Sequence, residues 1–235
     1  MTHAPNFSLA CMLFDLDGTL LDTAPDLISS LNYALKAEGL QGVSTDHIKP
    51  YVSNGAAVMI KHSTAKTITS SQHNKLLELM LDHYEQNIAI KTDYFQGIPA
   101  ILKKLEEKQI KWGIVTNKRS RFTTPLISSF GLEHRANCII SGDSTPHPKP
   151  NPLPLLAACK QSNVIPENCI YIGDACHDIE AGKQAHMKTI VATYGYLKTD
   201  DQPDTWGADA LIDHPQELAF WINKESPCHC ITKHF

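Results

Sequence analysis

Two aspartates one residue apart stand at the end of an apolar run near the start of the chain. They are Asp15 and Asp17, in the stretch CMLFDLDGTLLDTAPD (residues 11–26). Burying one unpaired carboxylate is costly, and two like charges about 4 Å apart repel by roughly 4 kcal/mol at an effective dielectric constant near 20. The pair therefore requires a cation beside it, and metal-assisted or acid–base chemistry is what such a pair can support.

A calcium-binding loop is an alternative explanation for Asp-x-Asp-Gly. In an EF-hand loop that began at Asp15, the sixth position would be glycine and the twelfth would be glutamate. The chain has Leu20 and Asp26 at these positions, which excludes an EF-hand.

Three further polar clusters follow apolar runs or lie in a loop on the same side of them. They are Thr116-Asn117 in WGIVTNK, Lys149 in HPKPNP, and Asp174 with Asp178 in GDACHD. Taken singly, each has an ordinary alternative: a turn, a solvated lysine, or an aspartate that caps the following helix. In open α/β sheets, however, ligands bind beyond the carboxyl ends of the strands, so the four clusters can converge on one site.

Short apolar runs alternate with amphipathic stretches along most of the chain, which predicts alternating strands and helices. The predicted strands are residues 10–16, 110–116, 137–141, 169–173, 188–193 and 210–213. The predicted helices are residues 98–109, 121–130, 152–163, 178–187 and 215–224. Strands that are continuously apolar and separated by helices indicate a doubly wound α/β core, in which helices cover both faces of a mostly parallel, Rossmann-like sheet.

Residues 23–93 break this alternation with two helical stripes and no convincing strand. Asp15 and Thr116 are 101 residues apart, whereas one strand–helix–strand crossover needs only about 30. The surplus predicts a helical cap domain inserted into the core. The predicted boundaries are 1–22 and 94–225 for the core, 23–93 for the cap, and 226–235 for a flexible C-terminal tail.

The composition is that of an ordinary globular protein. Of the 235 residues, 42% are hydrophobic and 20% are charged, and the formal net charge is −4. This charge argues against binding to a nucleic-acid backbone, and no apolar stretch is long enough to span a bilayer. Seven cysteines at irregular spacing and an N-terminal stretch without a basic region favour a cytoplasmic protein with no signal peptide. Nothing in the sequence indicates an oligomeric state.

The C-terminal tail carries Cys228, His229, Cys230 and His234, a combination that could bind a metal ion. Its C-x-C-x₃-H pattern lacks the spacing of a zinc finger. We therefore interpret it as a frayed terminus.

The four clusters resemble, in order, the four signature motifs of the haloacid dehalogenase (HAD) superfamily of phosphotransferases, and the resemblance covers nearly the whole chain. The helical insertion resembles the C1-type cap of the phosphoglycolate phosphatase-like branch. The strings TAPD (23–26) and WGIVTNK (112–118) and the stretch 194–218 are similar to bacterial N-acetylmuramic acid 6-phosphate phosphatases. The resemblance implies Mg²⁺-dependent hydrolysis of a small phosphorylated metabolite through an aspartyl-phosphate. It makes 2-phosphoglycolate and N-acetylmuramic acid 6-phosphate the leading substrates.

The resemblance also implies roles for the acidic residues. Asp15 is expected to attack phosphorus, and Asp17 to protonate the leaving group and then accept a proton from water. The expected Mg²⁺ ligands are Asp15, the backbone carbonyl of Asp17, and Asp174. Asp178 is expected to hold a water ligand of the metal or to orient Lys149.

Other residues are expected to bind the phosphate or the leaving group. Thr116 and the backbone N–H groups near Asn117 are candidates for phosphate oxygens, Lys149 adds a positive charge beside the transferring group, and Gly18 lets the chain turn sharply. Within the cap, the loop 51–59 is the candidate for substrate selection, through Asn54; an ordinary helix–helix turn is the alternative explanation of Asn54-Gly55. Lys118 and Arg119 could bind a substrate carboxylate or could be solvated.

Competing functions differ in what they require of the second aspartate. A dehalogenase expels halide without a proton, so the presence of Asp17 makes that activity improbable. A phosphomutase of the β-phosphoglucomutase type keeps both aspartates and a similar cap, and it stays open as the alternative. A catalytically silent binding protein is disfavoured because every charged motif position is filled.

Overall fold

A six-stranded, entirely parallel sheet forms the centre of the protein, in the strand order β5-β4-β1-β6-β7-β8. The computed structural model describes residues 7–64 and 68–223. The strands are β1 (Cys11–Phe14), β4 (Lys111–Val115), β5 (Cys138–Ile140), β6 (Cys169–Gly173), β7 (Lys188–Ala192) and β8 (Ala210–Ile212). All six predicted strands are confirmed.

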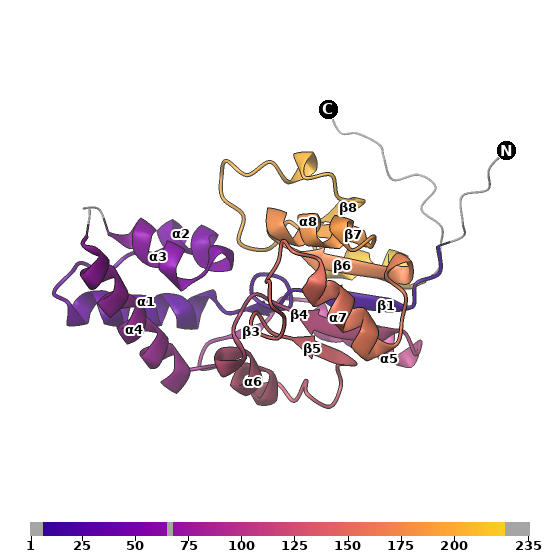
Figure 1. Ribbon diagram of the computed structural model, residues 1–235, viewed down its shortest axis with the longest axis horizontal. Helices are drawn as coiled ribbons and strands as arrows, with labels where there is room; N and C mark the ends of the chain where they lie inside the picture. Colours follow the sequence, from indigo (N-terminus) through magenta and orange to yellow (C-terminus); the bar gives the residue numbers. More distant parts are fainter. Residues whose placement is uncertain (1–6, 65–67, 224–235) are drawn as a thin grey trace.

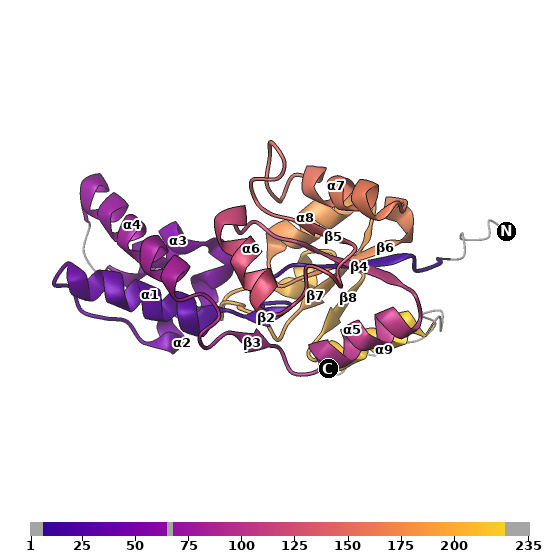
Figure 2. The ribbon, with the colours of Figure 1, turned by 90° about the horizontal axis from the view of Figure 1, so that it is seen from below.

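Helices cover both faces of the sheet, as Figure 2 shows for α7 and α8 on one side and α5 and α9 on the other. Side chains of β1 alternate between the two layers: Met12 and Phe14 pack with α5, α6 and α9, whereas Cys11 and Leu13 pack with α7 and α8. The helices are α5 (Ile98–Glu107), α6 (Ser120–Ser129), α7 (Leu153–Ser162), α8 (Cys176–Gln184) and α9 (Leu218–Ile222), with 3₁₀ turns at Pro166–Asn168 (η2), Pro203–Thr205 (η3) and Pro215–Glu217 (η4). The predicted doubly wound α/β core is confirmed.

A separate group of helices lies beside the sheet, at the left of Figure 1. It consists of α1 (Ala24–Ala37), α2 (Thr45–Ile48), the 3₁₀ helix η1 (Lys49–Asn54), α3 (Ala56–Ser63) and α4 (Ser70–Gln86). Leu31, Leu35 and Met80 are fully buried in a core of its own. This inserted segment is consistent with the predicted C1-type cap, and we call it the cap. Apolar periodicity predicts α1 and α4, whereas α2, η1 and α3 are too short to show it.

A two-stranded antiparallel ribbon joins the cap to the core. It pairs β2 (Leu21–Asp22) with β3 (Asp93–Tyr94), so the outgoing and returning connections run side by side. Asp26, buried at the start of α1, accepts hydrogen bonds from the backbone N–H groups of Lys91 (3.0 Å) and Thr92 (2.9 Å) and from the Thr92 hydroxyl (2.7 Å). The domain boundaries at 22/23 and 93/94 stay a prediction; they fall at this ribbon.

Two expectations concern the chain as a whole. In the part of the chain that the structure describes, no helix has the length and apolar character that a membrane crossing requires. The tail 226–235, with Cys228 and its neighbours, lies outside the described residues.

Candidate active site

The strand order brings the predicted motifs together. The chain runs from β1 to β4 and β5 on one side of β1 and then crosses to β6, β7 and β8 on the other. Asp15, Thr116 and Asp174 directly follow β1, β4 and β6, the three adjacent strands at this reversal. Parallel strands end at the same edge of a sheet, so these side chains meet at the crevice where α/β sheets bind ligands.

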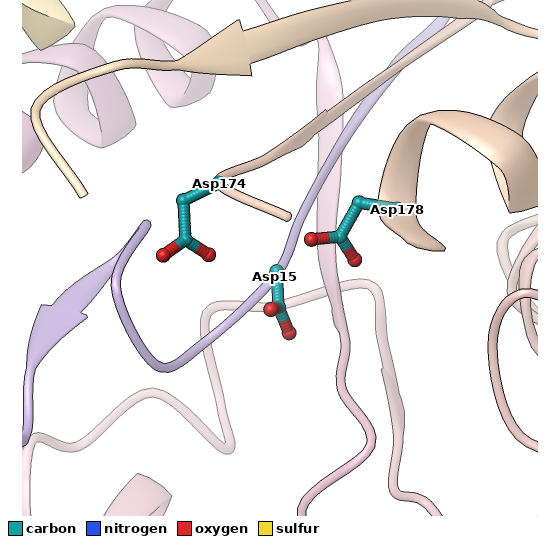
Figure 3. Close-up of side chains that lie close together, drawn as sticks. All are labelled: Asp15, Asp174 and Asp178. Carbon is teal, nitrogen blue, oxygen red and sulfur yellow. The ribbon is translucent and has the colours of Figure 1, made fainter. Parts of the chain in front are cut away.

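Three carboxylates, those of Asp15, Asp174 and Asp178, lie together at this edge (Figure 3). Each offers an oxygen within 4.8 Å of the others, and all three residues are buried. Among the described residues, the Oδ1 atoms of Asp15 and Asp174 accept no hydrogen bond. Buried carboxylate oxygens without a donor are destabilising unless a cation faces them. The donor set therefore fits a hard divalent cation, which prefers carboxylate oxygens.

Lys149 is the buried ammonium group within this cluster. Its three N–H groups donate to Val115 O (3.0 Å), Tyr171 Oη (2.7 Å) and Asp178 Oδ1 (2.7 Å). Its Nζ also forms an ion pair with Asp15, at 2.9 Å from Oδ1. When all groups are ionised, three carboxylates and one ammonium leave two negative charges uncompensated. That surplus matches the charge of one divalent ion.

Asp178 caps α8 and pairs with Lys149, while its expected role in holding a water ligand of the metal stays a prediction. Its Oδ2 accepts a hydrogen bond from the Ala175 N–H (3.1 Å) at the start of α8, and its Oδ1 receives Lys149 and the Tyr171 hydroxyl (3.1 Å). Both of its oxygens therefore have protein donors, whereas Asp15 Oδ1 faces the Lys149 ammonium without accepting a hydrogen bond and Asp174 Oδ1 accepts none from the described residues. Asp178 thus orients Lys149, and the assignment of Asp15 and Asp174 as metal ligands stays a prediction.

The electrostatics of the cluster separate its carboxylates. Burial, together with the neighbouring charge of Asp178, raises the pKa of Asp15 from 3.8 to about 6, although Lys149 opposes the rise. Burial and the same negative neighbours raise the pKa of Asp174 well above its ordinary value. Burial opposes ionisation of Asp178 as well, but Lys149, His177 and the Ala175 N–H hold its pKa below the usual range. A cation that bound Asp15 and Asp174 would therefore have to compete with protons for them.

Asp17 lies apart from the three-carboxylate cluster. Its carboxylate oxygens are 3.0 and 3.3 Å from Lys118 Nζ, and the Thr23 hydroxyl donates to Oδ1. The Lys118 side chain is 7% exposed, and its Nζ lies 4.6 Å from the ring centroid of Tyr84 in α4. Burial alone would lower the pKa of Lys118, but Asp17 and Tyr84 raise it above its ordinary value. Lys118 is thus buried and not solvated, and it holds the predicted general acid in place; its contact with a substrate carboxylate stays a prediction.

Gly18 and Tyr196 shape the pocket around Asp174. Gly18 has φ +81°, and a Cβ atom there would lie 2.2 Å from Asp174 Oδ2, so no larger residue fits. The Tyr196 N–H donates to the same oxygen (2.8 Å), while its hydroxyl donates to Asp22 Oδ1 (2.7 Å) and accepts from the Ala24 N–H (3.0 Å). Sequence reasoning assigned no role to Tyr196; the available signals were its place within the stretch 194–218 and in the loop after β7, at the same edge of the sheet.

Thr116 and Asn117 connect the end of β4 to the lysine loop. The Asn117 side chain donates to Lys149 O (3.0 Å) and accepts from Lys149 N–H (2.9 Å), which fixes the backbone that carries the buried ammonium group. Thr116 is buried, and its hydroxyl accepts a hydrogen bond from the Lys118 N–H (3.1 Å). Their role in binding phosphate stays a prediction, as does that of Gly18.

A cavity of about 550 Å³ opens between this edge of the sheet and the cap. Asp15, Asp17 and Thr116 line its core side, and Asn54 and Gly55 of the predicted cap loop line the opposite side. Apolar side chains form much of the remaining wall: Leu27, Val52, Met59, Leu77, Leu81 and Phe122. The cavity therefore places the predicted nucleophile opposite a largely apolar cap surface.

Comparisons with known proteins agree with this geometry. Residues 12–192 match the family model described as haloacid dehalogenase-like hydrolase. The chain is 37% identical over 222 residues to the N-acetylmuramic acid 6-phosphate phosphatase of Pseudomonas aeruginosa, which covers 94% of this chain and 98% of that protein. It is 36% identical over 207 residues to a phosphoglycolate phosphatase of Xanthomonas campestris, covering 88% of this chain and 93% of that protein.

Solved structures show the same architecture. The crystal structure of a protein from Haemophilus somnus, described as a predicted phosphoglycolate phosphatase, superposes with a TM-score of 0.80 at 26% identity. The superposition covers 92% of this chain and 97% of that one. With the sheet order, the inserted cap and the clustered aspartates, these matches show that the chain belongs to the haloacid dehalogenase-like hydrolases and is a phosphatase of the HAD type.

Proposed function

We propose that the protein is a cytoplasmic, Mg²⁺-dependent phosphomonoesterase that forms an aspartyl-phosphate on Asp15. The observation that carries the proposal is the surplus of two negative charges in the cluster of Asp15, Asp174 and Asp178, in which Lys149 faces Asp15 Oδ1 while the buried Oδ1 of Asp174 accepts no hydrogen bond within the described ranges. Mg²⁺ bound there would neutralise phosphate oxygens as negative charge develops on them. Asp15 and Asp174 would hold it, and Lys149 would balance the remaining charge.

The side chains account for both halves of the reaction. An Asp15 oxygen attacks phosphorus, the bond from phosphorus to the leaving oxygen breaks, and Asp17 transfers its proton to that oxygen. Asp17 then takes a proton from a water molecule, whose oxygen attacks phosphorus; the bond from phosphorus to the Asp15 oxygen breaks, inorganic phosphate leaves and the Asp15 carboxylate is restored. Lys118 keeps the Asp17 carboxylate in position through both steps.

Cavity size and lining support a bulky leaving group. A two-carbon glycolate would leave most of about 550 Å³ unfilled, whereas an N-acetylated amino sugar acid can cover the apolar wall formed by residues such as Leu27 and Met59. Lys118 is paired with Asp17, and Arg121 is paired with Asp82 and Glu85. Among the described residues, this leaves Arg119 as a cavity-lining arginine outside the ion pairs, available to a substrate carboxylate. Both candidate substrates carry a carboxylate that Arg119 could bind, so the size and apolar lining of the cavity are what lead us to favour N-acetylmuramic acid 6-phosphate over 2-phosphoglycolate.

A substrate panel tests this assignment. We expect kcat/KM for N-acetylmuramic acid 6-phosphate to exceed that for 2-phosphoglycolate by about 10²-fold, because only the larger leaving group contacts the cap wall. Glucose 1-phosphate with its bisphosphate activator serves as the phosphomutase arm. Faster turnover of 2-phosphoglycolate would refute the substrate assignment, and isomerisation without phosphate release would refute the phosphatase mechanism.

The proposed metal site also predicts a pH dependence. Without metal, the folded chain keeps a proton on Asp15 up to about pH 6, whereas an unfolded chain loses it near 3.8, so the free energy of unfolding falls as pH rises through this window. Mg²⁺ must displace that proton. We therefore expect the difference in Tm between Mg²⁺ and EDTA to be small near pH 5 and to grow up to about pH 7.5.

Thermal denaturation at several pH values measures this difference. Asp174→Asn should remove most of it, whereas Asp46→Asn, which changes an exposed carboxylate of α2, should preserve it. Asp15 loses its proton within the range from about pH 5 to about pH 7.5. A Tm difference that stays constant over this range in the wild type would therefore contradict the proposed ligands.

A further inference from the structure

One side chain of the cap reaches the carboxylate cluster directly. The hydroxyl of Ser53, in η1, donates a hydrogen bond of 2.8 Å to Asp174 Oδ2. Asp174 belongs to the core, 121 positions further along the chain, at the end of β6. The contact therefore exists only while the cap lies against the sheet edge.

The hydrogen bonds of Asp174 are divided unevenly between its two oxygens. Oδ2 accepts from both Ser53 and the Tyr196 N–H, each at 2.8 Å. Oδ1 is buried and accepts none from the residues that the structure describes. Two donors on one oxygen fix the plane of the carboxylate and leave the other oxygen free for the cluster. Outer hydrogen bonds of this kind orient metal ligands and tune their affinity.

The two donors to Asp174, Tyr196 and Ser53, belong to different parts of the protein. The Tyr196 donor is a backbone N–H of the core loop after β7, so it is present in any position of the cap. Ser53 is fixed to the cap, whose docked position is also held by Lys49 with Asp22 (3.7 Å) and by Arg121 with Asp82 (2.8 Å). The hydrogen bond from Ser53 to Asp174 therefore depends on the position of the cap, whereas the one from the Tyr196 N–H does not.

We propose that Ser53 is a positioning residue that raises the affinity of Asp174 for the divalent ion and ties metal binding to cap docking. The inference rests on the metal-dependent function proposed above. Coupling between two equilibria is reciprocal, so a bound ion also favours the docked cap. Substrate that closes the cap would therefore complete the metal site at the moment when it is needed.

Mg²⁺ titrations by isothermal calorimetry test the proposal without any substrate. We expect Ser53→Ala to weaken Mg²⁺ binding by about 10-fold, and Ser53→Thr, which keeps the hydroxyl, to recover most of the affinity. The matched control is Ser63→Ala in α3, whose hydroxyl donates to Ile60 O within the cap. Its Kd should equal that of the wild type.

Hydrogen exchange of η1 provides a second readout. Mg²⁺ should increase amide protection in residues 49–54 of the wild type but not of Ser53→Ala, because the link to Asp174 is missing. Unchanged Mg²⁺ affinity in Ser53→Ala, or an equal loss in Ser53→Thr or Ser63→Ala, would overturn the inference. A wild-type protein that fails to bind Mg²⁺ at all would instead overturn the proposed function.

Discussion

Asp15→Asn is expected to lower kcat for phosphate release by at least about 10⁴-fold, whatever the substrate. An amide oxygen at this position cannot accept a phosphoryl group, so the intermediate does not form. The substitution keeps the size of the side chain and removes one negative charge from a buried cluster in which the carboxylates outnumber the ammonium group. The variant should therefore be at least as stable as the wild type in EDTA.

Phosphate release and thermal denaturation measure the two effects on the same samples. Asp46→Asn makes the same chemical change at an exposed position and should leave both unchanged. Loss of the attacking group should cost far more than a factor of about ten. If Asp15→Asn kept activity within about tenfold of the wild type, another group would have to attack phosphorus.

Lys149→Met is expected to damage both catalysis and stability. Its ammonium group lies between Asp15 and Asp178 and has no exposed side-chain surface, so its removal leaves buried carboxylates uncompensated. We expect kcat/KM to fall by about 10³-fold and the free energy of unfolding in EDTA to fall by about 3–5 kcal/mol at neutral pH. The loss of stability should shrink when Mg²⁺ is added or when the carboxylates are protonated at about pH 5.

Urea denaturation with and without Mg²⁺ measures this pattern. Lys149→Arg keeps the charge and should be less destabilised than Lys149→Met, although the larger fork does not fit the same donor positions. The control is Lys103→Met, because the Lys103 side chain is 74% exposed and forms a long ion pair with Glu107 at 3.7 Å. An equal loss of stability at every pH would indicate lost packing instead of lost charge compensation.

Local sequence and strand topology together predicted the catalytic edge. Asp15, Thr116 and Asp174 each end an apolar run, and parallel strands connected by helices place such ends at one edge. The gap between the first two motifs predicted the inserted cap, because it is much longer than one strand–helix–strand crossover requires. These inferences needed only neighbours in sequence and the geometry of a parallel sheet.

Contacts between distant segments lay beyond that reasoning. The ion pair of Lys118 with Asp17 joins residues 101 positions apart, and the hydrogen bond of Ser53 with Asp174 joins residues 121 positions apart. Neither has a local signature, because an isolated lysine or serine has the same pattern on a solvated surface. β2 and β3 are each two residues long, which is too short for an alternating pattern to be visible in the sequence.

The proposed mechanism requires Asp15 to accept the phosphoryl group beside a Mg²⁺ ion held by Asp15 and Asp174. A crystal structure with Mg²⁺ and beryllium fluoride, a mimic of the phosphoryl group, tests this requirement most directly. We expect fluoride-bound beryllium on an Asp15 oxygen and Mg²⁺ about 2.0–2.1 Å from oxygens of Asp15 and Asp174. Beryllium fluoride on another side chain, or Mg²⁺ bound away from both aspartates, would contradict this assignment.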